Sequence, residues 1–152
     1  MRHSYYEAIL VVERLHRHFL EVVKVDLDRR GIQDINNVQA LILYNLAEDE
    51  MTVGELTARG YYLGSNVSYN VKKMFEAGYL MQERSPHDRR SVRVKLSEKG
   101  LALHKSLNES FEKQIGMLGE AKLADEEIAK SIETLRKLER FWTTLINYNR
   151  VG

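Results

Sequence analysis

The chain has 152 residues, a net charge of +1 and no cysteine, which excludes disulfides, thiolate metal sites and a thiol redox switch. Its length favours a single domain, with or without helical extensions, and is sufficient for a hydrophobic core. Because no apolar run is long enough to cross a bilayer and the first residues lack a signal-peptide core, we expect a cytoplasmic protein.

The small net charge hides an uneven distribution along the chain. Between Arg59 and Lys95 there are eight lysines and arginines against three acids, a net charge of +5, and the rest of the chain carries −4. A basic centre between acidic arms indicates a local site for a polyanion. A charged face that only contacts solvent is the alternative on charge alone.

The first half of the chain predicts four helices. Residues 5–27 have apolar side chains at a spacing close to 3.6, which indicates an amphipathic helix that Gly31 ends. Asp34 is a plausible N-cap for a second helix. Thr52, followed by Glu55, forms a capping-box pattern that predicts the start of a short third helix. Gly64 interrupts the chain, and Ser65 is a plausible cap for a fourth helix.

The predicted fourth helix has two distinct faces and ends at Gly78. Its expected inner face is apolar and its outer face is polar and basic. A pair of short helices with such an outer face is typical of a helix-turn-helix unit. The expected inner residues are Val67, Val71, Met74 and Phe75, and the expected outer residues are Ser68, Tyr69, Lys72 and Lys73.

A β-hairpin is predicted directly after this unit. Residues 79–84 and 91–96 read as strands, the second with strict alternation of polar and apolar side chains, and "SPHDRR" reads as the turn between them. Pro86 stiffens this turn. The sequence therefore predicts a mainly α fold with a small β-hairpin wing, that is, a winged helix-turn-helix domain.

Two further helices are predicted after the hairpin. Ser97 caps the first of them, and Asp125 opens the second. The N-terminal helix and these two carry more apolar surface than a small central unit can cover, so we interpret them as dimerisation helices. The alternative is that they pack on one another within one subunit. The seam expected in the last helix consists of Ile128, Ile132, Leu135, Leu138, Trp142, Leu145 and Ile146.

The two arginines of the predicted turn fit a role in DNA binding. In a winged helix, one helix enters the major groove and the hairpin tip reaches the neighbouring minor groove. A narrow minor groove has an enhanced negative potential that arginine exploits well. We therefore expect Arg90 to insert, Asp88 to orient it, and Arg89 to lie nearer the phosphates.

The stretch from Asp88 to Gly100 resembles the wing signature of the MarR family of bacterial transcriptional regulators, D-x-R-x-x-x-x-x-L-T-x-x-G. Asp88, Arg90, Leu96 and Gly100 match, and Ser97 replaces the threonine. The preceding "LTARGYYLGSNVSYNVKKMFEAGYL" is also similar to the family pattern, although its "ARGYYLGSN" turn is richer in aromatic residues and glycine. The flanking helices agree in length and order, so the resemblance covers nearly the whole chain.

This resemblance implies a homodimeric, sequence-specific transcriptional regulator, associated with the nucleoid, that binds a palindromic operator in double-stranded DNA. It implies dimerisation segments at 1–33 and 98–152 around a DNA-binding domain at 34–97. Many relatives bind small aromatic or phenolic ligands, often in a crevice between these parts. The expected DNA-contacting residues are Ser65, Asn66, Ser68, Tyr69, Lys72, Lys73, Asp88, Arg89 and Arg90, and the expected effector-binding residues are His16, Phe19, Tyr44, Tyr61 and Tyr62.

Other kinds of function find less support in the residues. His16 and His18 point to different sides of a helix and cannot chelate one ion together, so neither a metal site nor a cofactor is expected. The chain shows no catalytic set, and an enzyme is not expected. A winged-helix module that binds proteins rather than DNA is the remaining alternative. Such a module should expose apolar anchors where this chain places polar side chains.

Overall fold

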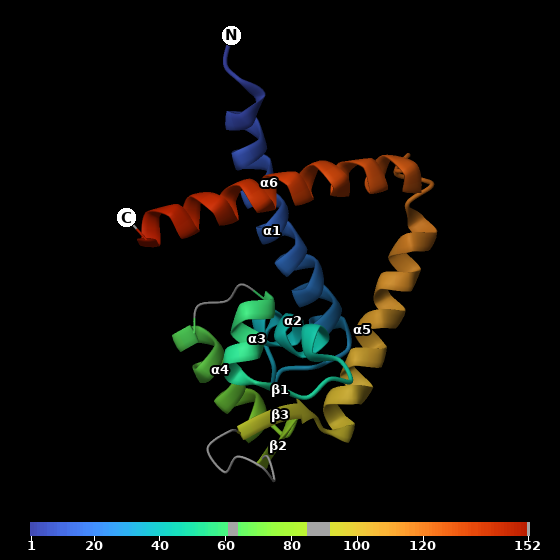
Figure 1. Cartoon of the computed structure of the whole chain (residues 1–152). Coiled ribbons are helices and arrows are strands. Elements are labelled where there is room, and N and C mark those ends of the chain that lie inside the picture. The colour runs from blue at the N-terminus through green and yellow to red at the C-terminus, as the bar shows by residue number, and fades with distance from the viewer. Residues whose placement is uncertain (61–63, 85–91, 152) are drawn as a thin grey trace. The chain divides into compact units, whose positions relative to one another are not determined.

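The computed structural model describes residues 1–60, 64–84 and 92–151 of the chain. The structure is mainly helical with one small sheet, and its elements follow the predicted order (Figure 1). They are α1 (Ser4–Arg29), α2 (Asn37–Leu46), β1 (Met51–Thr52), α3 (Val53–Gly60), α4 (Gly64–Glu76), β2 (Leu80–Arg84), β3 (Val92–Leu96), α5 (Glu98–Met117) and α6 (Asp125–Val151). The predicted fold class is confirmed, and β1 is an addition that the sequence did not predict.

Several predicted boundaries coincide with local hydrogen bonds. Thr52 and Glu55 form the predicted capping box, with each side chain bonded to the other residue's backbone N–H at 3.2 and 3.1 Å. Ser97 caps α5, since its Oγ accepts from the backbone N–H of Gly100 at 3.1 Å. Gly31 and Gly78 follow α1 and α4 in the left-handed region, with φ of 71° and 87°.

The predicted cap of the second helix is wrong. Asn36, rather than Asp34, is the N-cap of α2: its side chain accepts from the Gln39 backbone at 2.8 Å, and the Gln39 side chain accepts from the Asn36 backbone at 3.1 Å. Asp34 instead bonds with Tyr79 and Lys99, which are distant in sequence. Both residue types are good caps, so only these long-range partners distinguish them.

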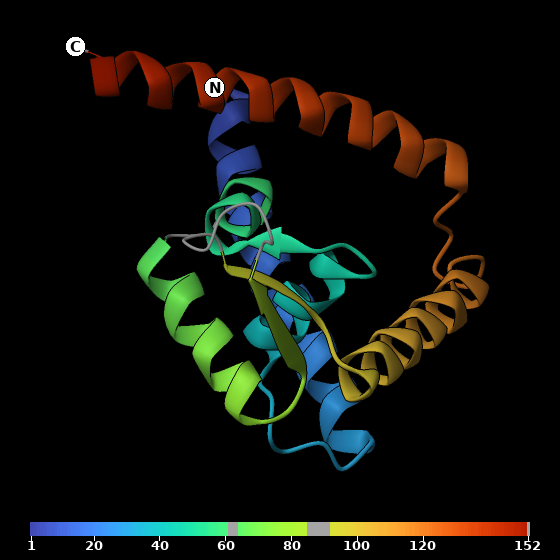
Figure 2. The same ribbon diagram turned by 60° about the horizontal axis from the view of Figure 1, so that its bottom comes forward.

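The sheet has the strand order β1-β3-β2 and is antiparallel throughout (Figure 2). Leu80 pairs with Leu96 at the base of the β2–β3 hairpin, and Arg84 pairs with Val92 at the other end. Val94, in the central strand, is 1% exposed and belongs to the core. One face of the sheet thus joins a core to which each helix from α1 to α5 contributes buried side chains.

The chain divides into two compact units, Met1–Ser110 and Phe111–Gly152. The first contains the sheet and the buried core, and α5 begins in it. The second contains the end of α5 and all of α6. Large apolar side chains are exposed on α1 and from the end of α5 onwards, among them Tyr6, Leu10, Leu15, Val25, Ile115, Leu135, Leu145 and Ile146.

Candidate nucleic-acid interface

Helix α4 presents one apolar and one polar face. Val67, Val71 and Met74 are at most 4% exposed and fix the inner face in the core. The opposite face is therefore held rigidly at the surface. Its hydrogen-bonding groups are free to meet base edges or phosphates. Every predicted DNA-contacting side chain on α4 whose burial is described is exposed: Asn66, Ser68, Tyr69, Lys72 and Lys73.

Two details of α4 differ from the prediction. The helix begins at Gly64, so Ser65, which was predicted to cap it, lies inside the helix instead. Phe75 was expected on the inner face but is 44% exposed. It follows the fully buried Met74 by one residue, a rotation of about 100°, which turns it away from the core.

The two lysines of α4 have different surroundings. Lys73 Nζ lies 3.8 Å from a carboxylate oxygen of Glu76 and 5.8 Å from the ring centre of Tyr69. Both Lys73 and Glu76 are about half exposed, so this ion pair is weak. Lys72 forms no ion pair with any residue in the described ranges. Both ammonium groups are therefore able to pair with a phosphate.

The wing strands bring further cations to the surface. Arg93 and Arg84 are exposed on β3 and β2, near the end at which the predicted turn begins. Neither has an ion-pair partner within the part of the chain that the structure describes. The sequence assigned them no role, although both were counted in its basic stretch. Asp88, Arg89 and Arg90 of the predicted tip lie outside the described residues, and their roles stay predictions.

Other cations of the basic stretch are already paired. Lys95 Nζ lies 2.7 Å from Glu83 and 3.6 Å from Glu50, and the hydrogen bond between Lys95 and Glu83 raises the pKa of the lysine and lowers that of the carboxyl. Arg59 pairs with Asp49 at 2.7 Å. Because Asp49 and Glu50 precede the basic stretch in sequence, counting charges within it overestimates the free positive charge.

A cluster at the base of the wing, which we call the wing-base cluster, consists of Asp34, Tyr79 and Lys99. The Tyr79 hydroxyl donates to Asp34 Oδ1 at 2.5 Å, and Lys99 Nζ donates to Asp34 Oδ2 at 2.6 Å and to the Ala77 carbonyl at 2.8 Å. The ammonium also lies 4.4 Å from the centre of the Tyr79 ring. The hydrogen bonds from Lys99 and Tyr79 lower the pKa of Asp34.

The packing beside this cluster explains the glycine of the wing signature. A Cβ at Gly100 would lie 2.3 Å from the Tyr79 carbonyl oxygen and 3.1 Å from Leu96 Cβ. Ser97 Oγ donates to the Gly78 carbonyl at 2.6 Å, so the start of α5 is bonded to the turn that follows α4. Only a residue without a side chain allows this close approach.

Comparison with solved structures places this fold among known regulators. AbsC of Streptomyces coelicolor, a MarR family transcriptional regulator, is 20% identical with a TM-score of 0.75, over 95% of this chain and 97% of AbsC. Streptococcus pneumoniae FabT in complex with DNA is 22% identical with a TM-score of 0.73, over 93% and 99% of the two chains. Staphylococcus aureus MarR in complex with salicylate and kanamycin is 18% identical with a TM-score of 0.76, over 92% and 93%.

Sequence comparison gives the family itself. The model for the winged helix DNA-binding domain matches residues 35–100. The exopolysaccharide II synthesis transcriptional activator ExpG of Rhizobium meliloti is 34% identical over 145 residues, which cover 95% of this chain and 75% of ExpG. The chain belongs to the MarR family. It is a DNA-binding transcriptional regulator of the MarR type, and the predicted resemblance is confirmed.

The predicted effector residues of this MarR-family regulator are only partly described. His16 and Phe19 are exposed on α1, and Tyr44 is half-buried on α2. Tyr44 stacks on His104 of α5 with ring centres 4.8 Å apart, and its hydroxyl donates to Asn108 at 3.1 Å. Tyr61 and Tyr62 lie outside the described residues. The crevice therefore stays a prediction.

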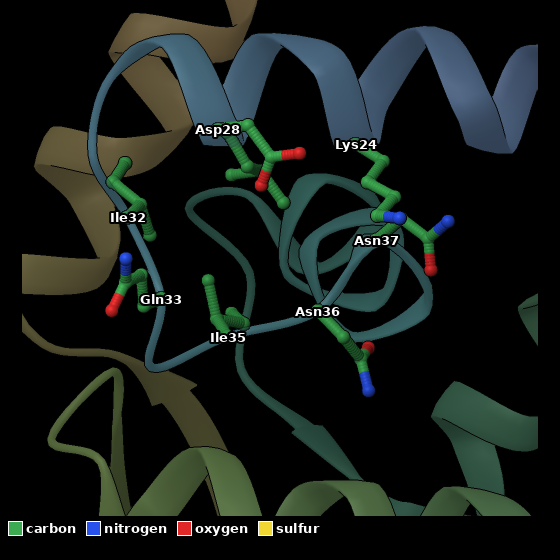
Figure 3. A pocket seen from close by; sticks show the side chains of 8 residues that line it. Lys24, Asp28, Ile32, Gln33, Ile35, Asn36 and Asn37 are labelled. Carbon is green, nitrogen blue, oxygen red and sulfur yellow. The ribbon is translucent and has the colours of Figure 1, made fainter.

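A pocket of about 310 Å³ opens elsewhere, between the end of α1 and the start of α2 (Figure 3). Of the predicted effector residues that the structure describes, none lines it. Lys24 and Asp28 project from α1 above it, and Ile32 and Ile35 supply apolar contacts from the connecting segment. Within the described part of the chain, no three His, Cys, Asp or Glu side chains gather as a possible metal site, and no helix is long and apolar enough to span a membrane.

Proposed function

We propose that this regulator binds a palindromic operator as a homodimer, with residues 34–97 as the DNA-binding domain and residues 1–33 and 98–152 as dimerisation segments. The observation that carries the proposal is the exposed polar and basic face of α4, whose opposite face is locked into the core. A rigid helix with such a face can enter a major groove and offer donors and acceptors to base edges.

Within this proposal, the residues of α4 divide into two groups. Asn66 can bond with adenine through both atoms of its amide, and Ser68 and Tyr69 reach base edges or thymine methyls. Lys72 and Lys73 bind phosphates and set the position of the helix without reading sequence. Ser65, at the start of α4, is the remaining predicted DNA contact on this helix.

The homodimer is proposed from apolar side chains that the single chain leaves exposed. On α1, Leu10, Leu15 and Val25 are 54, 56 and 63% exposed. On α6, Leu135 and Ile146 are 46 and 51% exposed. Apolar stripes on long helices are stabilised when they pack against a second copy, because apolar area is then removed from water.

We further propose that an aromatic or phenolic acid modulates DNA binding from a crevice lined by His16, Phe19, Tyr44, Tyr61 and Tyr62. The support is the salicylate complex of the S. aureus relative and the aromatic stack of Tyr44 on His104. Such a ligand must bind more tightly to a form of the dimer whose two α4 helices are spaced wrongly for the operator. A ligand with equal affinity for this form and for the DNA-binding form would not change the balance between them.

The test begins with selection of bound fragments from random DNA by the purified protein. We expect a palindromic consensus with half-sites roughly one helical turn, about ten base pairs, apart. Asn66→Ala should then reduce the ratio of specific to random affinity, whereas Lys73→Ala should weaken binding to both kinds of DNA alike. The reverse pattern would contradict the division of α4, and failure to select any consensus would favour a protein-binding module.

Modulation by a ligand is tested on the selected operator. Titration with salicylate should lower operator affinity and change the melting temperature of the protein. Tyr44→Phe keeps the ring stack but removes the hydroxyl that bonds with Asn108. A changed response to salicylate in this variant would locate the ligand near Tyr44. If neither operator affinity nor melting temperature changes with salicylate, the crevice proposal loses its support.

A further inference from the structure

The wing-base cluster lies where three elements meet that do not adjoin in sequence. Asp34 belongs to the segment between α1 and α2, Tyr79 follows the turn at the end of α4, and Lys99 lies in the first turn of α5. Tyr79 is also the last residue before β2. One carboxylate therefore holds the end of the recognition helix, the base of the wing and the start of α5 together.

The covalent link between recognition helix and wing is short, and it contains a flexible residue. Only Ala77, Gly78 and Tyr79 separate α4 from β2, and Gly78 has a φ of 87°. The backbone N–H of Tyr79 bonds with the Met74 carbonyl at 3.0 Å, which fixes the turn to α4. The contacts of the Tyr79 side chain then act on the direction of β2 together with the pairing of β2 and β3.

The Tyr79 side chain is held at both of its ends. It is 3% exposed, its hydroxyl donates to Asp34, and the Lys99 ammonium lies over its ring while donating to the same carboxylate. Burial and then the hydrogen bond to Asp34 raise the pKa of Tyr79, so the hydroxyl keeps the proton that it donates. The opposite side of the turn is fixed by Ser97 and by the close approach of Gly100.

We propose that Asp34 is a positioning residue for DNA recognition, which acts through Tyr79 and Lys99 to fix the direction of the wing relative to helix α4. Asp34 does not contact DNA in this scheme. It sets the angle at which the wing leaves the recognition helix, so that base contacts from α4 and minor-groove contacts from the wing are made together. The proposal rests on the proposed contacts of α4 and the wing with DNA.

The matched variants are Tyr79→Phe and Ser110→Ala. Each removes one hydroxyl that donates to an aspartate carboxylate, the first to Asp34 and the second to Asp26 of α1. Asp34→Asn and Lys99→Arg complete the set. Lys99→Arg keeps a cation that can donate to Asp34 and lie over the Tyr79 ring. It should therefore preserve much of the flank preference that Asp34→Asn loses.

Affinity is measured well below the melting temperature on selected operators that carry either A·T or G·C flanks, and on a scrambled core with G·C flanks. Tyr79→Phe should reduce the wild-type preference for A·T flanks by about threefold or more, because wing contacts are lost only in part. Its preference for the correct core should stay within about twofold of the wild type. Ser110→Ala should keep both preferences.

A merely structural role would give another pattern, in which Tyr79→Phe lowers the active fraction and weakens binding to every duplex by one factor. That pattern would overturn the proposal. So would a Tyr79→Phe protein that retains its full flank preference, or a Ser110→Ala protein that loses it to the same extent.

A measurement without DNA separates this proposal from the proposed function. Residual dipolar couplings of backbone amides in α4 and in β2–β3 of the free protein should fit one common alignment in the wild type and in Ser110→Ala. In Tyr79→Phe and Asp34→Asn, the couplings of β2–β3 should no longer fit the alignment of α4. A common alignment in all variants would overturn the proposal, even if the wild type shows no flank preference and the wing function fails.

Discussion

The winged-helix part and the long terminal helices use the same amphipathic pattern for different purposes. In the winged-helix part, Leu43, Leu56 and Met74 are 0% exposed, because their neighbours along the same chain cover them. On α6, Leu135 and Leu145 repeat at helical spacing yet remain 46 and 42% exposed. The amphipathic pattern alone thus indicates that an apolar helix face needs a partner. Only the structure distinguishes faces that the described chain itself covers from faces that it leaves exposed.

The exposed surfaces of the two regions also differ in kind. Side chains that α4 presents to solvent are mostly polar or basic, with Tyr69 and Phe75 as its exposed aromatic residues. Those that α1 and α6 present include many large aliphatic groups. A polar, basic surface suits a hydrated polyanion, whereas an aliphatic surface suits another apolar face.

The largest expected effect comes from placing a charge on the apolar face of α6. Leu145→Asp would bury an unpaired carboxylate in the proposed dimer, at a cost of about 3–5 kcal/mol. Since each 1.4 kcal/mol is a factor of ten, operator affinity should fall on the order of 100-fold or more. Light scattering should show a monomer that retains its helical circular dichroism.

Thr144→Asp is the control for this variant, because it adds the same charge one residue away, about 100° around the helix from the seam. It should remain dimeric and bind the operator nearly as the wild type does. A wild-type protein that is monomeric at micromolar concentration would contradict the proposed dimer, and the exposed face of α6 would then need another partner.

Two glycines of helix α5 allow a closely packed position to be compared with an open one. A Cβ at Gly100 would meet the Tyr79 carbonyl oxygen at 2.3 Å, whereas a Cβ at Gly116 has no atom within 4 Å. Gly100→Ala should therefore destabilise the fold by about 1–3 kcal/mol through overpacking. Gly116→Ala should stabilise it by about 0.5–1 kcal/mol, because alanine is the better helix former.

Thermal unfolding checks both substitutions, at about 2–4 °C per kcal/mol for a protein of this size. The two melting temperatures should move in opposite directions. Equal and small shifts would show that the start of α5 is not closely packed on the Gly78–Tyr79 turn, and would remove the explanation given for the glycine of the wing signature.

The sequence predicted the order of elements because most of its signals are local. Gly78, Ser97 and the Thr52–Glu55 box act within one turn of the helix they bound, and the structure has each of them at the predicted place. The two-residue strand β1 has no periodicity to detect.

What the sequence missed depends on contacts between distant residues. Asp34 and Asn36 are both good caps, and the structure has Asn36 as the N-cap of α2. Asp34 instead bonds with Tyr79 and Lys99, which are 45 and 65 residues away in sequence. The pairing of Lys95 with Glu50 likewise depends on the β1–β3 register. In the candidate site, the exposed face of α4 was predicted, but the distinction between free and paired cations was not.

A smaller effect is expected from the predicted tip of the wing. Arg90→Ala should cost about 1–3 kcal/mol of specific affinity, as other lost readout contacts do. The loss should be larger on operators with A·T-rich flanks, because narrow minor grooves are A·T-rich. Asp88→Ala should also weaken binding, since it removes the group that orients Arg90, although charge alone predicts tighter binding to all DNA.

Both variants are compared with the wild type on A·T- and G·C-flanked sites at one fixed salt concentration. Tighter binding by Asp88→Ala, with no flank dependence for Arg90→Ala, would mean that the arginines form only a positive patch. The wing would then resemble the solvated alternative, and α4 alone would carry sequence discrimination.

The smallest effect concerns the acid sensitivity of the winged-helix part. Hydrogen bonds from Lys99 and Tyr79 lower the folded-state pKa of Asp34 below the ordinary value of 3.8. A carboxyl whose pKa is lower in the folded state contributes stability above its unfolded-state pKa, and this contribution is lost as the pH falls through the folded-state value.

Since the Asp34 and Lys99 side chains are each 48% exposed, solvent screens the pair and its contribution is at most about 1 kcal/mol. Urea unfolding of wild type and Asp34→Asn between pH 7 and pH 3 should therefore show a constant small difference near neutrality that shrinks below about pH 4. If the difference between wild type and Asp34→Asn instead grows as the pH falls, Asp34 is held in its neutral form, and the charge-assisted bond with Lys99 does not contribute to holding the base of the wing.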